Sequence, residues 1–513
     1  MEVNCNGDNW SLGWTDDPRT TNFCNHLWTL RFVGIFKERV KKLTLCIFCY
    51  LIYGCSSGSL TESDPTQETL TLNKPVFKPN PIILEDSVSY YSSACNNPSF
   101  QFLIPTDINN DRYVDFIAHF WCDSETPAEI SFNDVPDILV AYVSDDYGIY
   151  NVDNVDVFGE LYPKLGGSSR KYARGDINQD GKDDFAFAMN SEDGRAAYDF
   201  DSWQTNYALP AILLSTNSGY EVVNIGKKDW GHSVQIQNNK VLFGGHSSQA
   251  FKYINSSWHD ISHEYIELSF ASFLVFDDYI LNSVRRGSSQ GLELIKNNQI
   301  ISSVMKNEKF KVYFEGWNNK GTGNYQEMGV YEFNNNLYLN GMTTEMCKKD
   351  NLIVATVNAS KPVNRDIIEN EYYSETETTP VVLLSFYEII DNQIIERDIK
   401  VINEEISHNY NFFDCTDVNQ DQKKDIVAQV FSQAWNNQSP NNKGVPEIYI
   451  NSGGGEYFNL NTSSWPEFSI NDDSQGYLYD VNKDGNQDLV MFPLKANFTA
   501  NVEIYLSNKN IVQ

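Results

Sequence analysis

The sequence predicts an all-β protein, a seven-bladed β-propeller built from four-stranded blades. Short runs of β-branched and aromatic residues are bounded by Gly, Asn, Asp and Ser, the usual pattern of strands and turns. Amphipathic helical patterns are absent. An Asp-rich turn also recurs at intervals that indicate a repeating unit of about 60 residues.

The Asp-rich turn has the form D-x-N-x-D-x-x-x-D and is here called an acidic loop, with its positions numbered one to nine. It occurs four times, and the copies start at residues 107, 176, 417 and 480. The steps between starts are 69, 241 and 63 residues, and 241 is close to four steps of about 60. Three units without an acidic loop therefore fit between the second and third copies, which predicts seven units.

A second phrase supports this count: a strand-like run that ends in a polar turn, such as LPAILLSTNSG. The phrase occurs seven times, at 135–146, 209–219, 249–258, 291–300, 379–389, 445–455 and 500–510. Short strands at such even spacing favour radial blades, and closing the ring protects the sheet edges. A tandem array of small β domains is the structural alternative.

The acidic loops carry the arrangement that a hard cation requires. Oxygen side chains at positions one, three and five converge in one loop, and position seven offers a carbonyl, so that Ca²⁺ can gather its oxygen ligands. The start resembles an EF-hand loop, but an EF-hand needs Glu at position twelve. The chain has Ala118, Phe187, Ala428 and Met491 there, and each copy has Asp at position nine instead. The alternative is a solvated Asp/Asn hairpin without metal.

A D-x-N-x-D-x-x-x-D loop followed directly by a strand resembles the FG-GAP or VCBS repeats of integrin alpha-subunit heads and bacterial surface propellers. The resemblance covers roughly residues 80 to 513. It implies a seven-bladed propeller, structural Ca²⁺ in the hairpin loops of some blades, and a role in cell adhesion. The metal ligands that it implies are side chains at positions one, three, five and nine and the carbonyl at position seven: Asp107, Asn109, Asp111, Asp115 and Tyr113; Asp176, Asn178, Asp180, Asp184 and Lys182; Asp417, Asn419, Asp421, Asp425 and Lys423; Asp480, Asn482, Asp484, Asp488 and Asn486.

Position six of the acidic loops predicts a ranking of their affinities. This position turns sharply and favours Gly, which takes positive φ freely. Gly181 and Gly485 meet this need, whereas Arg112 and Gln422 would take a left-handed conformation at a cost of roughly 1 kcal/mol. We therefore expect the second and fourth loops to bind calcium more tightly than the first and third.

The N-terminal part divides into three segments before the propeller at 81–513. Residues 1–39 fit no signal pattern and are predicted to be a non-native or disordered extension, with translation starting near Val40. Residues 40–55 combine two lysines with a short apolar stretch, which is typical of a secretory signal. An uncleaved membrane anchor is the alternative. Residues 56–80 are predicted to form a polar tether. The stretch from Leu70 to about Pro81 is predicted to supply a strand that closes the ring.

The signal segment ends in Ile-Tyr-Gly-Cys, which resembles a bacterial lipobox. The resemblance implies that Cys55 becomes the lipidated first residue of the mature protein. Ser56 beside it favours sorting to the outer membrane. We therefore expect an envelope lipoprotein, periplasmic or surface-exposed, that touches the membrane only through this anchor.

The net charge limits the possible binding partners, and the cysteines indicate possible disulfides. The net charge of −31, without a long basic run, excludes nucleic acid as a reasonable partner. In an exported chain Cys95 could pair with Cys122, and Cys347 with Cys415. Free buried thiols are the equal alternative.

Motifs for catalysis are not found. The sequence has no P-loop, no G-x-G-x-x-G, no G-x-S-x-G and no H-E-x-x-H. His232, His246, His259 and His263 fall within one predicted blade, where strand patterns favour scattered histidines over a zinc site. Most tryptophans are expected to pack in the core, and one or two could stack on sugars.

The sequence thus favours a non-catalytic, calcium-stabilised module that binds a protein or polysaccharide ligand. A calcium-dependent carbohydrate-active enzyme, such as a polysaccharide lyase, is the first alternative. A purely structural envelope component without a ligand is the second.

Overall fold

The computed structural model describes residues 76–84, 98–122, 137–161, 163–191, 207–269, 271–286, 289–306, 474–493 and 502–508. It also describes 310–403 with short gaps, 409–431 without 420 and 424, and 447–459 without 454–455. The predicted N-terminal extension, the signal segment with Cys55 and the tether up to residue 75 lie outside these residues. Among the described residues, no helix has the length and apolarity needed to span a membrane.

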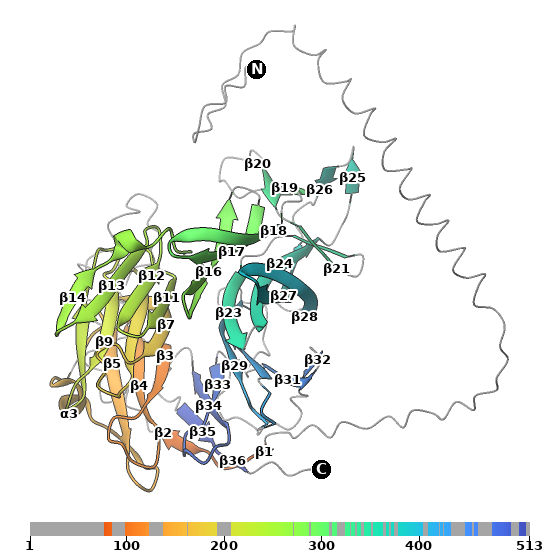
Figure 1. Cartoon of the computed structure of the whole chain (residues 1–513). Coiled ribbons are helices and arrows are strands. Elements are labelled where there is room, and N and C mark those ends of the chain that lie inside the picture. The colour runs from red at the N-terminus through yellow and green to blue at the C-terminus, as the bar shows by residue number, and fades with distance from the viewer. Residues whose placement is uncertain are drawn as a thin grey trace, which may run out of the picture. The chain divides into compact units, whose positions relative to one another are not determined.

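Seven antiparallel blades follow one another along the chain, and the first four are simple meanders (Figure 1). Each is numbered here in chain order. Blade one contains β3 (Pro98–Thr106), β4 (Asp115–Cys122), β5 (Asp137–Ser144) and β6 (Tyr150–Val152). Blade two contains β7 (Ser168–Gly175), β8 (Asp184–Ser191), β9 (Ala211–Ser215) and β10 (Tyr220–Asn224). Blade three contains β11 (Ser233–Gln237), β12 (Lys240–Gly244), β13 (Gln249–Ile254) and β14 (Ser257–Asp260). Blade four contains β15 (Phe273–Phe276), β16 (Tyr279–Arg286), β17 (Ser289–Lys296) and β18 (Gln299–Lys306).

Blade five carries additional strands, and blades six and seven return to the simple pattern. Blade five contains β23 (Thr343–Lys349), β24 (Leu352–Pro362), β27 (Thr378–Ile390) and β28 (Gln393–Asn403). The strands β21 (Val330–Phe333) and β22 (Asn336–Leu339) extend its sheet along β24, and two hairpins accompany it: β19 (Phe310–Phe314) with β20 (Asn324–Met328), and β25 (Asp366–Ile368) with β26 (Glu371–Tyr373). Blade six contains β29 (Asn409–Thr416), β30 (Asp425–Phe431), β31 (Glu447–Gly453) and β32 (Glu456–Asn459).

Blade seven is completed by the start of the described chain, and this closes the ring. Its strands are β33 (Ser474–Tyr479), β34 (Asp488–Pro493), β35 (Val502–Tyr505) and the N-terminal β2 (Ile82–Leu84). A short pair, β1 (Val76–Phe77) with β36 (Ser507–Asn508), adds a second tie between the two chain ends. The stretch from Leu70 to Pro81 was expected to supply the closing strand; it supplies β1, and the strand within the blade starts one residue later.

The ring is continuous, because the first strand of each blade contacts a strand of the preceding blade. β3 contacts β7, β7 contacts β11, β11 contacts β15, β15 contacts β23, and β23 contacts β29. β30 contacts β33, and β34 of blade seven contacts β3 of blade one. The prediction of a seven-bladed β-propeller is therefore confirmed. The described helical elements are short, α3 (Asn154–Phe158) and the 3₁₀ turn η1 (Ser262–Glu264).

The core consists of apolar layers between neighbouring blades rather than one central cluster. In β8, Phe185, Phe187 and Met189 face a layer shared with blade one, whereas Ala186 and Ala188 face a layer shared with blade three. Successive residues of a strand point to opposite faces, and both faces of this blade are covered. This explains why the second strands read as continuous apolar runs instead of alternating ones.

The acidic loops and the second phrase recur at equivalent places in the blades. Each acidic loop lies between the first and second strands of its blade, in blades one, two, six and seven. Blades three, four and five have no such loop, as the spacing predicts. All seven occurrences of the second phrase overlap the third strand of a blade, namely β5, β9, β13, β17, β27, β31 and β35.

Candidate metal-binding loops

The four acidic loops occupy equivalent corners of four blades that are neighbours in the ring. They connect first to second strands, so all four lie at the same end of the blades. Position two of each loop is an apolar residue, and Ile177, Val418 and Val481 are buried beneath their loops. The local sequence thus anchors each loop on the core and leaves the polar positions at the surface.

Positions one, three and five converge in the second and fourth loops. In the second loop the N–H of Asp180 donates both to Oδ1 of Asp176, at 3.0 Å, and to Oδ1 of Asn178, at 3.0 Å. The Asp180 carboxylate in turn accepts the N–H of Lys182 at 2.9 Å. The fourth loop repeats this arrangement through Asp480, Asn482, Asp484 and Asn486, all at 2.8–3.0 Å. Three oxygen-bearing side chains are thereby held around one small turn.

The third loop has the same arrangement. Asp421 donates its N–H to Asp417 at 3.1 Å and to Asn419 at 3.2 Å, and it accepts the N–H of Lys423 at 2.8 Å. Gln422 at position six adopts φ 66°, in the same region as Gly181 at 86° and Gly485 at 89°. The expected left-handed turn at position six is therefore present in three loops, including one without Gly.

The aspartate at position nine has a structural task that the sequence pattern did not reveal. One oxygen of Asp184 accepts the N–H of Ile177 at 2.6 Å and of Asn178 at 3.2 Å. The other accepts the N–H of Ser215, at the end of the third strand, at 2.6 Å. Asp115, Asp425 and Asp488 make the equivalent bonds, to Ile108 and Ser144, to Val418 and Asn451, and to Val481 and Ser507.

Burial makes the position-nine carboxylates unusual acids. Desolvation raises the pKa of Asp488 to about 7 and that of Asp425 to about 6, and the neighbouring loop carboxylates add to both shifts. Burial also raises the pKa of Asp115 and of Asp184, against the opposing effect of their backbone hydrogen bonds. The charged form of each loop is therefore costly in the absence of a nearby cation.

The donor set fits a hard cation. All the groups at positions one, three, five and nine offer oxygen, and Oδ1 of Asp107 is buried without a hydrogen-bond partner within the described chain. No group of three or more Asp, Glu, His or Cys side chains within the described ranges is arranged as a metal cluster. Ala118, Phe187 and Met491, at position twelve, are fully buried in the second strands, which agrees with a loop that is not an EF-hand.

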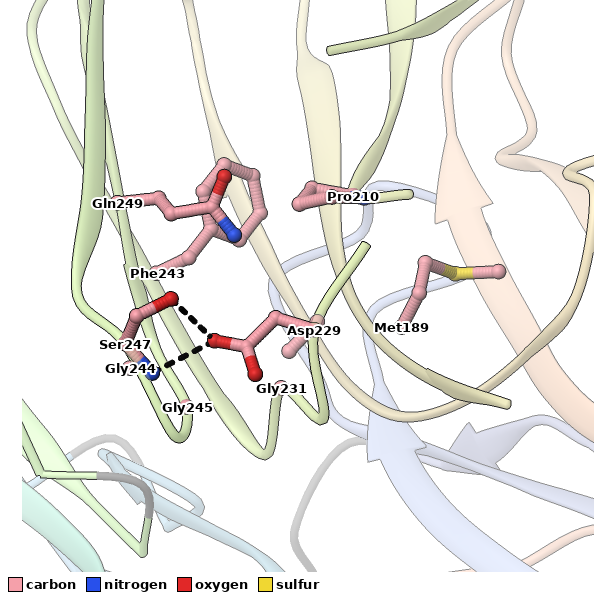
Figure 2. A pocket seen from close by; sticks show the side chains of 10 residues that line it. Met189, Pro210, Asp229, Gly231, Phe243, Gly244, Gly245, Ser247 and Gln249 are labelled. Carbon is pink, nitrogen blue, oxygen red and sulfur yellow. Dashed lines mark hydrogen bonds between the residues drawn. The ribbon is translucent and has the colours of Figure 1, made fainter. Parts of the chain in front are cut away.

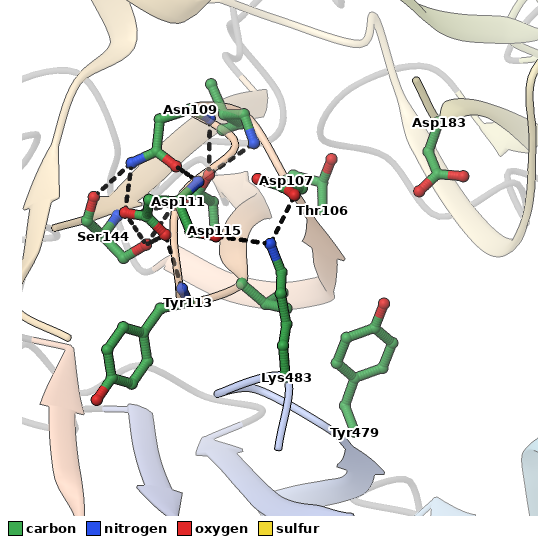
Figure 3. A network of polar contacts seen from close by, with 12 residues as sticks. Thr106, Asp107, Asn109, Asp111, Tyr113, Asp115, Ser144, Asp183, Tyr479 and Lys483 are labelled. Carbon is green, nitrogen blue, oxygen red and sulfur yellow. Dashed lines mark hydrogen bonds and ion pairs between the residues drawn. The ribbon is translucent and has the colours of Figure 1, made fainter. Parts of the chain in front are cut away.

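The third-strand serines are part of the loops and were missed by sequence reasoning. Oγ of Ser215 lies 3.1 Å from both carboxylate oxygens of Asp180 and 2.6 Å from Asp184. Oγ of Ser144 makes the same contacts with Asp111 and Asp115, at 2.8–3.3 Å (Figure 3). Both serines end the third strand of their blade within a copy of the second phrase, and this recurrence was the signal that could have identified them.

Two of the four histidines that the sequence placed in one blade lie near each other, and the other two lie elsewhere. His232 and His246 pack edge-on against Trp230, with ring centroids 4.8 and 5.1 Å apart, whereas His259 and His263 lie in β14 and η1. Nearby, Asp229 accepts two hydrogen bonds from Ser247, at 2.7 and 2.8 Å, beside a cavity of about 10 Å³ (Figure 2). This cavity has room for about one water molecule and none for a sugar.

The first strands of four blades line a second small cavity. Lys171 of β7 and Glu345 of β23 form an ion pair at 2.6 Å, although blades three and four lie between the two blades that carry these residues. The cavity beside this pair is about 50 Å³ and is also lined by Ser233, Gln235 and Phe273. Burial raises the pKa of Glu345, and the Lys171 ammonium opposes this shift. A cavity of this size cannot hold a saccharide unit.

One disulfide lies in the described chain. Cys347 of β23 pairs with Cys415 of β29, with their Cα atoms 5.8 Å apart, and it joins the first strands of blades five and six. The pairing of Cys95 with Cys122 cannot be followed, because Cys95 lies outside the described residues. Four tryptophans also lie outside the described residues: Trp203, Trp317, Trp435 and Trp465.

Fold and loops together define the chain as a seven-bladed β-propeller with acidic hairpin loops. No family model matches it, and no curated protein matches it significantly. Among solved structures it is similar to a computationally designed protein, Ika8, with 7% identity, a TM-score of 0.34, and 80% of this chain and 97% of that chain covered.

Two further similar structures are polysaccharide lyases. One is the lyase Uly1, with 8% identity, a TM-score of 0.32, and 85% of this chain and 99% of that chain covered. The other is an ulvan lyase of family PL25 bound to -[GlcA(1-4)Rha3S]-, with 10% identity, a TM-score of 0.34, and 81% and 95% covered.

Proposed function

We propose that the protein is a calcium-stabilised propeller of the FG-GAP or VCBS kind, which acts as a non-catalytic binding or adhesion module for a protein or polysaccharide. The observation that carries the proposal is the recurrence of one oxygen-rich loop at the same corner of four neighbouring blades. Chance clustering of acidic residues would not reproduce the same hydrogen bonds from loop to loop.

Calcium would be held by positions one, three and five of each loop, with the carbonyl at position seven and the carboxylate at position nine. Bound calcium supplies positive charge that offsets the repulsion between these carboxylates. The residues themselves connect the loop to the third strand through position nine, so a filled loop would fasten three strands of its blade together. Calcium is therefore proposed as a structural ion and not as a catalyst.

The proposed location is the cell envelope, with the chain attached through a lipid on Cys55, as an outer-membrane lipoprotein that is periplasmic or surface-exposed. The pairing of Cys347 with Cys415 supports an oxidising compartment, because such bonds are rare where thiols are kept reduced. The net charge of −31 supports an environment rich in divalent cations.

Binding is proposed to use the surface of the propeller rather than its axis. The two cavities described above have volumes of about 10 and 50 Å³, and an ion pair lines the larger one. A polysaccharide lyase remains the alternative function, and it requires a catalytic acid and base that no feature of the described residues singles out.

Arrays of glycans and of envelope proteins, probed with purified protein in calcium and in EDTA, test this proposal. We expect binding that depends on calcium and leaves the glycan intact. Release of oligosaccharides with unsaturated ends would support the lyase instead. Absence of any bound glycan or protein in calcium would contradict both and favour a purely structural component.

A further inference from the structure

The first acidic loop differs from the other three in how it uses its position-one carboxylate. In the second loop, Asp176 accepts the N–H groups of positions five and six, both at 3.0 Å. Asp417 and Asp480 do the same in the third and fourth loops. In the first loop the N–H of Asp111 donates to Asn109 at 3.1 Å, and Asp107 accepts no bond from its own loop.

Position six explains this difference. Gly181, Gln422 and Gly485 adopt positive φ, which presents their N–H groups to the position-one carboxylate. Arg112 does not adopt positive φ, although Asn110 at position four does, at 56°, as Gln179 and Lys483 do at position four of their loops. The Asp107 carboxylate is therefore left without the backbone donors that hold its counterparts in place.

A lysine from the neighbouring blade occupies this position. Nζ of Lys483, in the fourth loop, lies 2.6 Å from Oδ2 of Asp107 and donates to the carbonyl of Asp111 at 3.0 Å (Figure 3). The N–H of Val114 also donates to the carbonyl of Val481 at 2.8 Å, which fixes the two loops against each other. The ammonium thus contacts two kinds of oxygen, carboxylate and carbonyl, that calcium would use.

We propose that Lys483 is the resident cation of the first acidic loop, so that calcium binds the second, third and fourth loops and enters the first only weakly. This inference rests on the proposed calcium-binding function. It also changes the expected ranking of the calcium affinities. Gln422 adopts the positive φ that position six of the third loop needs, so only the first loop lacks this conformation.

Two other loop lysines of the described chain have contacts within their own blades. Nζ of Lys182 donates to the carbonyl of Thr216 in its own blade, at 2.9 Å. Nζ of Lys423 lies 3.5 Å from Asp421 of its own loop. Lys182→Met is therefore a matched control, since it keeps the backbone carbonyl that is proposed as a calcium ligand and removes the same charge from the same end of the propeller without freeing the first loop.

Calorimetric titration of the full chain with calcium tests the proposal, using the wild type, Lys483→Met and Lys182→Met. Methionine has an unbranched apolar side chain about as long as the carbon stem of lysine and lacks the ammonium. We expect Lys483→Met to gain one calcium site, or to strengthen the weakest site by roughly ten-fold, because a like charge beside a cation site is removed. Lys182→Met should not gain a site.

Two further variants assign the new site and check the fold. Adding Asp107→Asn to Lys483→Met should abolish the gained site, and Lys483→Arg should leave the wild-type pattern unchanged. Comparison of melting temperatures in EDTA shows whether each variant is folded. If Lys483→Met is folded and binds calcium like the wild type, the inference is wrong although the proposed function stands. If the wild type binds no calcium, both are wrong.

Discussion

The aspartate at position nine is the residue on which each acidic loop depends. Its two oxygens accept backbone N–H groups from the start of the loop and from the third strand, and its side chain is fully buried in all four copies. The carboxylate therefore joins a surface turn to the interior of the sheet. The loop would keep part of this order without calcium, since these bonds do not require the ion.

Replacement of Asp184 by Ala should destabilise the calcium-free protein by about 2 to 4 kcal/mol, because buried N–H groups lose a charged acceptor. Urea unfolding in EDTA measures this loss. Asp180→Ala is the control, since Asp180 is exposed and its change should cost clearly less. Equal losses for the two variants would show that position nine has no special structural task.

The raised pKa values of Asp488, about 7, and Asp425, about 6, predict how stability depends on pH. An unfolded Asp has a pKa of about 3.9, so between pH 4 and 7 the folded state binds more protons than the unfolded state. This contribution to the stability is complete below about pH 4 and is lost as the pH rises through about 7.

The melting temperature in EDTA should therefore fall as the pH rises from about 5 to about 8, and Asp488→Asn should flatten this fall. Saturating calcium should reduce the dependence, because the ion favours the charged carboxylates. A calcium-free protein that gains stability over this interval, with Asp488→Asn unchanged, would disagree with the buried acids described above.

The blades are the elements that the sequence predicted best. Strand periodicity and turn residues are local signals, and each repeat of the chain shows them again. The blade count and the position of each acidic loop therefore followed from the spacing of the repeats. The extra hairpins of blade five did not, because they interrupt the period. A ring-closing strand was expected from Leu70 to about Pro81, but its exact residues, Ile82–Leu84, could not be derived locally, since their partner Val502–Tyr505 lies at the other end of the chain.

Contacts between loops were not predictable for the same reason. Lys483 and Asp107 are 376 residues apart in sequence and meet only because the ring closes. The bond from Asp184 to Ser215 spans 31 residues and depends on the register of the third strand. Spacing within a loop indicated the oxygen donors, whereas their partners were set by how the blades pack.

The disulfide between β23 and β29 is a cross-link between neighbouring blades. The double variant Cys347→Ala, Cys415→Ala should be less stable by about 2 to 4 kcal/mol, because the bond closes a loop of 68 residues in the unfolded chain. Thermal melting with and without a reductant measures the loss. The reductant should lower the melting temperature of the wild type and leave that of the double variant unchanged; an unaffected wild type would contradict the pairing.

The whole molecule is a ring whose stability is distributed over its blade interfaces. An apolar layer joins each pair of neighbouring blades, and the ends of the chain meet in blade seven. The four acidic loops lie in blades six, seven, one and two, on both sides of this closure. Calcium in these loops would therefore strengthen the part of the ring where the chain begins and ends.

Calcium content and melting temperature, measured together on the purified full chain before and after EDTA treatment, test the calcium-stabilised propeller most directly. We predict that the protein retains tightly bound calcium, that EDTA lowers its melting temperature by several degrees, and that added calcium restores it by mass action. A protein that retains no calcium and melts at the same temperature in calcium and in EDTA would contradict the proposal that these loops are metal sites.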